Sequence, residues 1–241
     1  MDHWKQAFWL VKFELKKSIT AIGLLLLMAI SASYFFSEFY VFYRDTGIIF
    51  YELAFLMVFG IAAIWAKPKE FQYQKINDET WGLPLFMTLS QLPIKREALI
   101  NSRFLIYYFY SIPLHLLILI SVYTLTPALR ESMDIPSFLV FSLIWLSFGV
   151  SVGSIFPAVD AGDYITLLKS TIQTIPLFFG IVVALVLIQM GTENGIVAWT
   201  MIAATEWPFQ SIVGSVLIVR LSTVFWKRKM KQKIQKVDYF S

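Results

Sequence analysis

Residues 135–156 decide the fold class, and they read IPSFLVFSLIWLSFGVSVGSIF, without one charged side chain. A helix needs about 20 mostly apolar residues to cross the hydrocarbon core of a bilayer. This stretch is therefore predicted to be a transmembrane helix.

The composition extends this prediction to the whole chain. Its 241 residues are 58% hydrophobic and 15% charged, and the mean hydropathy is +0.67. A soluble domain has about 45–50% apolar and about 25% charged residues. Because the surplus apolar side chains need lipid to face, the chain is predicted to be an integral membrane protein.

Five further apolar stretches predict an all-α polytopic membrane protein with six transmembrane helices in one domain, residues 1–241. They are Ile19–Phe36, about Thr46–Ala66, Phe104–Leu125, Ile172–Met190 and Phe209–Trp226. The apolar stretch Ile196–Ala204 is too short to cross, and Pro208 follows it, where a proline starts or breaks a helix. We expect a partial helix in the outer leaflet; the alternative is one kinked helix joined to the last span.

The basic residues orient these spans, because lysine and arginine concentrate on the cytoplasmic side. With the N-terminus inside, 18 of the 20 Lys and Arg residues lie inside, and only Arg44 and Arg130 lie outside. The chain is thus expected to be a multi-pass protein with both termini cytoplasmic. Its lysine-rich, cysteine-free character favours a bacterial plasma membrane.

Both termini carry a feature outside the spans. In residues 1–18, Trp4, Phe8, Val11 and Leu15 recur at helical spacing with lysines on another face, which predicts an interfacial helix; the alternative is a cytoplasmic lead-in. Residues 227–241 form a basic tail. We expect this tail to be an anchor held by anionic membrane lipids, and the alternative is a contact with a partner protein.

Catalytic and cofactor motifs are absent from the sequence. There is no G-x-x-x-x-G-K-[ST] phosphate-binding loop, no G-x-S-x-G elbow and no H-E-x-x-H zinc motif. The chain has no cysteine and two histidines, so no metal site is expected. We expect no enzyme activity, no cofactor in this chain and no nucleic-acid partner.

Two ionisable residues lie inside the predicted spans, where such groups are functional candidates. Glu52 lies within two turns of the outer end of its span, so its structural interpretation is contact with the interface. His115 follows Pro113, so its structural interpretation is a bond to a carbonyl freed by the proline. Asp160 and Asp163 are interpreted as a solvated turn, with a pair of metal-binding acids as the alternative.

The connection 67–103 is the one long loop on the inner side. Residues 83–89 predict a short apolar helix, and Pro93 fits the start of the next helix, where its missing N–H costs nothing. A short apolar helix on the cytoplasmic side needs a surface to pack on: the protein's own spans, lipid, or a groove in a partner.

This pattern resembles the permease subunits of ABC transporters, in the six-helix type-2 exporter class. The resemblance is carried by residues 89–97, LSQLPIKRE, together with the N-terminal helix, the span count and the short apolar stretch before the last span. In that family the loop between spans two and three often holds an apolar helix, then a Leu-Pro step, then a basic residue and a helix into span three.

The resemblance implies a permease that forms the translocation path of an exporter for a peptide, antimicrobial or lipid-like substrate. It implies two copies of a cytoplasmic ABC ATPase, which bind ATP and Mg, and a second permease subunit, the same or a sister chain. The residues expected to couple to the ATPase are Leu85, Phe86, Leu89, Pro93, Lys95, Arg96 and Glu97. The alternative functions are a membrane-embedded enzyme and a regulatory membrane protein without transport activity.

Overall fold

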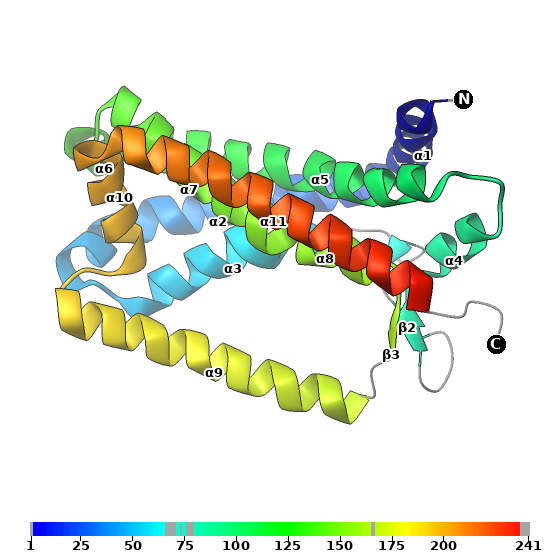
Figure 1. Ribbon diagram of the computed structural model, residues 1–241. Coiled ribbons are helices and arrows are strands. Elements are labelled where there is room, and N and C mark those ends of the chain that lie inside the picture. Colours follow the sequence, from blue (N-terminus) through cyan, green and yellow to red (C-terminus); the bar gives the residue numbers. More distant parts are fainter. Residues whose placement is uncertain (1, 66–70, 73, 76–79, 165–166, 237–241) are drawn as a thin grey trace.

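The computed structural model describes residues 2–65, 71–72, 74–75, 80–164 and 167–236. These residues are almost entirely helical (Figure 1), as expected for an all-α membrane protein. The helices are α1 (His3–Lys17), α2 (Ile19–Thr46), α3 (Ile49–Trp65), α4 (Pro84–Ser90), α5 (Arg96–Leu125), α6 (Pro127–Ser132), α7 (Ile135–Gly153), α8 (Ile155–Val159), α9 (Leu167–Thr192), α10 (Ile196–Glu206) and α11 (Pro208–Lys236).

Four helical units of the described chain are long and apolar enough to cross a membrane: α2, α5, α7 together with α8, and α11. A fifth span results if α9 and α10, which meet at a bend of 55°, are counted as one. Helix α3 is apolar but has only 17 residues. The structure therefore supports a membrane protein of four or five spans, and the count of six stays a prediction.

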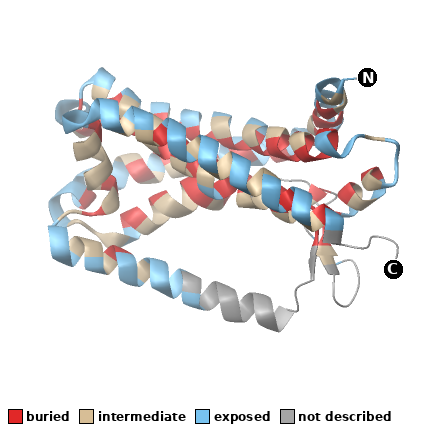
Figure 2. Cartoon of the chain, in the orientation of Figure 1, coloured by how far each residue is buried: buried red, intermediate tan, exposed pale blue. Residues whose placement is uncertain are grey.

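Helices α5 and α7 form the centre of the bundle. Helix α5 packs on α1, α2, α3 and α7, while α7 also contacts α10 and α11. Helix α9 lies at one side of the molecule (Figure 1), and Figure 2 shows that α11 is largely exposed along its length. Exposed apolar helices of this kind fit a lipid environment rather than water.

Aromatic rings fill the contact between α2, α3 and α7. The ring of Phe55 lies 4.7 Å from that of Phe36 and 4.5 Å from that of Trp145, and all three side chains are at most 2% exposed. Offset and edge-on ring pairs at such distances add to the packing beyond their buried area. This cluster holds α3 against the centre of the bundle.

Helices α5 and α11 are longer than the hydrocarbon core. They have 30 and 29 residues, which at about 1.5 Å per residue is about 45 Å, against a core of about 30 Å. The start of α5 and the end of α11 lie together at the end of the molecule that also carries α1 and α4 (right in Figure 1). We call this the basic end, because the lysines of α1 and the basic run of α11 lie there.

Three short strands complete the basic end, and the sequence did not predict them. They are β1 (Gln74–Lys75), β2 (Thr80–Gly82) and β3 (Asp163–Tyr164), and they pair antiparallel in the order β1-β2-β3. Trp81 is the residue opposite both Lys75 and Asp163. The sheet thus ties the connection before α4 to the connection before α9.

Candidate functional site

The basic end contains its own hydrophobic cluster, separate from the core between the spans. Helix α4 contributes Phe86 and Leu89, α1 contributes Leu10, and α11 contributes Met230. Of these, Phe86 and Met230 are fully buried. The cluster also includes residues of α5 and Ala158 of α8, so five helices from the start, the middle and the end of the chain share one apolar interior.

The structure divides the seven residues expected to couple to an ATPase into two groups. Pro93, Lys95, Arg96 and Glu97 are exposed at the turn from α4 into α5. Leu85 is half-buried, while Phe86 and Leu89 point into the hydrophobic cluster of the chain itself. The expectation that Phe86 and Leu89 enter a groove of a partner is therefore corrected: their helical face is used to fix α4 to the protein.

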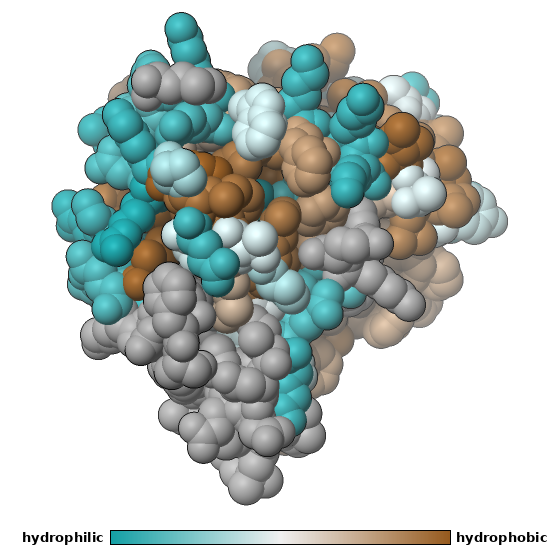
Figure 3. Space-filling view, turned by 90° about the vertical axis from the view of Figure 1, so that its right-hand side faces the viewer, coloured by the Kyte–Doolittle hydropathy of each residue, from teal (hydrophilic) through white to brown (hydrophobic). Residues whose placement is uncertain are grey.

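The opposite face of α4 remains exposed. It presents Pro84 and Thr88, and the turn that follows adds Gln91 and Leu92, of which Leu92 is 49% exposed. Figure 3, which looks onto the basic end, shows apolar surface bordered by hydrophilic side chains. A partner that binds this end meets these residues rather than Phe86.

A buried ion pair that the sequence did not predict joins α1 to α5. Arg103 Nη2 lies 2.7 Å from Glu14 Oε2, and the two side chains are 1% and 0% exposed. Buried charges are retained in proteins almost only as pairs. The sequence contains only a weak signal for this pair, namely one acid among the lysines of the N-terminal helix and one arginine at the start of a span.

As far as residue 236, the basic tail is a continuation of helix α11 and not a separate segment. Lys227 Nζ donates a hydrogen bond of 2.8 Å to Asn101 Oδ1 and lies 5.5 Å from the centre of the Phe104 ring. One turn later, Met230 enters the hydrophobic cluster. The first part of the tail is therefore packed on α5, and residues 237–241 lie outside the described residues.

At the opposite end of the bundle, Glu52 is the centre of a buried hydrogen-bond network. Its Oε1 accepts a bond of 2.6 Å from the Tyr43 hydroxyl and one of 3.2 Å from the backbone N–H of Val197. The Tyr43 oxygen in turn accepts a bond of 3.0 Å from the Ala198 N–H. A carboxylate at a helix N-terminus satisfies free N–H groups and stabilises the helix dipole, so Glu52 fixes the start of α10.

This arrangement corrects the expectation that Glu52 reaches the membrane interface, because its side chain is fully buried. It also gives Gly195 a specific role. A Cβ atom at Gly195 would lie 1.6 Å from Glu52 Oε1. Only glycine leaves room for the carboxylate at this position.

His115 is fully buried between α3, α5 and α7. Its ring lies 4.8 Å from that of Phe59, and a Cβ atom at Gly149 would come within 2.6 Å of the imidazole. Neither ring nitrogen makes a hydrogen bond of normal geometry with the described residues. The expected bond to a carbonyl freed by Pro113 is therefore not observed, and Gly149 provides the space that the ring occupies.

The expectation of a solvated turn before α9 is corrected for Asp160, which is buried. Asp160 is 3% exposed, and its carbonyl accepts a bond from Leu83 N, while Asp163 belongs to strand β3. Within the described residues, no three His, Cys, Asp or Glu side chains come together as metal ligands.

No protein family, curated protein or solved structure matches the chain.

Proposed function

We propose that the chain is the membrane-spanning permease subunit of an ABC exporter, driven by a separate cytoplasmic ATPase. The observation that carries the proposal is helix α4. It is a short helix at the basic end with one face fixed to α1, α5 and α11 and the other face exposed. A partner that pushes on the exposed face moves the buried face and the spans attached to it.

The connection from α4 to α5 supports this role. Five residues, 91–95, connect the end of α4 at Ser90 to the start of α5 at Arg96. Helix α5 runs unbroken for 30 residues from this turn into the centre of the bundle. A displacement of α4 is thus transmitted along a continuous helix that packs on α2, α3 and α7.

In this proposal the protein has six spans, formed by α2, α3, α5, α7 with α8, α9 and α11. Helix α10 then returns into the outer leaflet without crossing it. Both termini lie on the cytoplasmic side, so that the basic end faces the ATPase. Two ATPase copies bind ATP and Mg, and a second permease subunit completes the translocation path. The chain itself supplies the path and the coupling surface.

Capture of the ATPase tests the proposal. Each ABC ATPase encoded in the genome of the source cell is used in turn as bait, and the chain is supplied in lipid nanodiscs as wild type or as Leu92→Glu. Leu92 is exposed at the end of α4, and a buried charge in an interface is strongly unfavourable unless it is paired. We expect the wild type to bind and Leu92→Glu to lose most of the binding without a change in its melting temperature.

Leu125→Glu is the matched control, because Leu125 is a leucine exposed at the other end of α5. It should bind the ATPase as the wild type does. If neither the wild type nor the control captures the ATPase or stimulates its ATP hydrolysis, the proposed function is rejected. If Leu92→Glu binds normally, α4 is not the coupling surface.

A further inference from the structure

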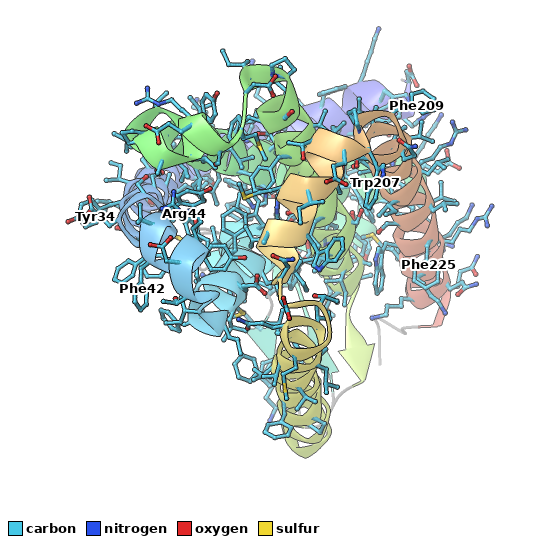
Figure 4. The ribbon with its side chains drawn as sticks, turned by 90° about the vertical axis from the view of Figure 1, so that its left-hand side faces the viewer. Tyr34, Phe42, Arg44, Trp207, Phe209 and Phe225 are labelled. Carbon is cyan, nitrogen blue, oxygen red and sulfur yellow. The ribbon has the colours of Figure 1, made fainter. Side chains whose placement is uncertain are left out.

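A pocket opens at the end of the bundle opposite the basic end, between the end of α2, the end of α9 and helix α10. Its volume is about 480 Å³, within the range of about 300–1,000 Å³ typical of small-molecule sites. Figure 4 looks onto this end and shows Arg44 at the end of α2, on one side of α10, with Trp207 on the other side.

The lining of the pocket combines apolar side chains with few charges. Met133, Met201 and Ile202 supply apolar surface, and methionine adapts its shape to varied ligands. The charged residues are Arg44, Asp45 and Glu193. A ligand that fits this pocket has an apolar body. The three charged residues determine which ligand charge the pocket favours.

Two features remove the positive charge from the pocket. Arg44 Nε is bound to Asp45 Oδ1 at 3.0 Å, so this pair is neutral as a unit. The start of α10, which would otherwise attract an anion, already has its Val197 and Ala198 N–H groups bonded to Glu52 and Tyr43. What remains is the carboxylate of Glu193, which has no ion-pair partner among the described residues.

The residues around the pocket also carry an excess of negative charge. Six acidic side chains lie at this end against two arginines; the acids are the buried Glu52 together with Asp45, Glu131, Asp134, Glu193 and Glu206, and the arginines are Arg44 and Arg130. Such a distribution attracts cations and raises their local concentration.

Glu193 also occupies a position that its residue type does not favour. Its φ is +61°, and its N–H donates a hydrogen bond of 2.9 Å to the Gln189 carbonyl. Glu193 therefore ends helix α9 in the left-handed conformation. Glycine or asparagine is usual there. Strained residues of this kind gather at functional sites.

We propose that this pocket binds a hydrophobic organic cation, with Glu193 as its counter-ion. The inference goes beyond the proposed permease function and does not depend on it. An organic cation with an apolar body places that body against Met133, Met201 and Ile202 and its charge beside Glu193.

Two ions of nearly the same shape and opposite charge provide the test: tetraphenylphosphonium and tetraphenylborate. The full chain is placed in phosphatidylcholine nanodiscs, and each ion is titrated by calorimetry, with empty nanodiscs as the blank. We expect saturable binding of the phosphonium to the protein above the blank, and none of the borate.

Variants then locate the site. Glu193→Gln and Glu193→Gly should raise the Kd of the phosphonium about two- to fivefold, the size of one ion pair in a hydrated site. Glu193→Gly relieves the left-handed backbone, so its melting temperature should not fall. Glu206→Gln, at the same end but outside the pocket lining, should bind as the wild type does.

Met201→Trp should abolish binding by filling the pocket, and Glu193→Gly keeps the test valid if the tryptophan prevents folding. Equal affinity for phosphonium and borate, an unchanged Kd in both Glu193 variants, or no saturable binding would each overturn the proposal. Because the ATPase is absent, failure here leaves the proposed permease function standing, and failed ATPase capture leaves this site standing.

Discussion

At the scale of single residues, Glu52 is a fully buried carboxylate whose position is set by hydrogen bonds. A carboxylate away from water is unfavourable unless it is hydrogen bonded. Glu52 Oε1 accepts bonds from the Tyr43 hydroxyl and the Val197 N–H, while Oε2 is buried without a hydrogen-bond partner among the described residues. Its position therefore depends on residues 9 and 145 positions away. This dependence makes the network sensitive to any atom that displaces the carboxylate.

Gly195→Ala tests that sensitivity. The added methyl group would overlap Glu52 Oε1, and overpacking of this kind costs about 1–3 kcal/mol. We expect a lower melting temperature and faster proteolysis near α10. Gly191→Ala is the matched control, because no atom lies within 4 Å of a Cβ there; it should be neutral or slightly stabilising. Equal effects of the two changes would contradict the network.

Phe86 provides the second test at this scale. It is fully buried in the cluster of the basic end, and Phe→Ala at such a site costs about 3–5 kcal/mol. Leu92→Ala, at an exposed position, should stay within about 0.5 kcal/mol of the wild type. Thermal unfolding in nanodiscs measures both. If the Phe86→Ala protein is as stable as the Leu92→Ala protein, Phe86 is exposed rather than buried in the cluster.

At the scale of elements, the Glu14–Arg103 pair connects α1 to the helix that follows α4. Removing one partner of a buried pair leaves an uncompensated charge, at a cost of about 3–5 kcal/mol. We expect Glu14→Gln and Arg103→Met each to lower stability strongly, and the double variant to recover a large part of the loss. A double-mutant cycle on melting temperatures measures this coupling.

The exposed Arg44–Asp45 pair is the control for this prediction. Its side chains are 49% and 57% exposed, and such surface pairs contribute about 0–1 kcal/mol. Arg44→Ala should therefore leave stability nearly unchanged. If the Glu14 and Arg103 variants behave the same way, α1 is held by its apolar contacts alone.

At the scale of the whole molecule, the number of membrane crossings is a testable prediction. Length and composition of the described helices support four or five spans, and the proposal of six requires α3 and α9 to cross separately. Reporter fusions decide between the counts. Fusions at Asp45, Arg130 and Glu193 should report outside, and those at Lys75, Asp163 and Lys233 inside. An outside signal at Lys75 or Lys233 would exclude the six-span topology.

The sequence by itself determined the class of protein, because hydrophobicity and length are properties of consecutive residues. The uninterrupted apolar stretch at 135–156 and the short helix near 83–89 were both predictable in this way, and both are helices in the structure. The three short strands were not predictable, since none of them is stable without its partners across the sheet.

Only the tertiary structure decided which side chains are buried and what they contact. The helical spacing of Leu85, Phe86 and Leu89 predicted an apolar face on α4, but a face alone does not say whether the protein or a partner covers it. Likewise, Glu52 and Glu14 find their hydrogen-bond and ion-pair partners on helices distant in sequence. Such contacts depend on how helices pack, and packing is set by the whole bundle rather than by any one stretch.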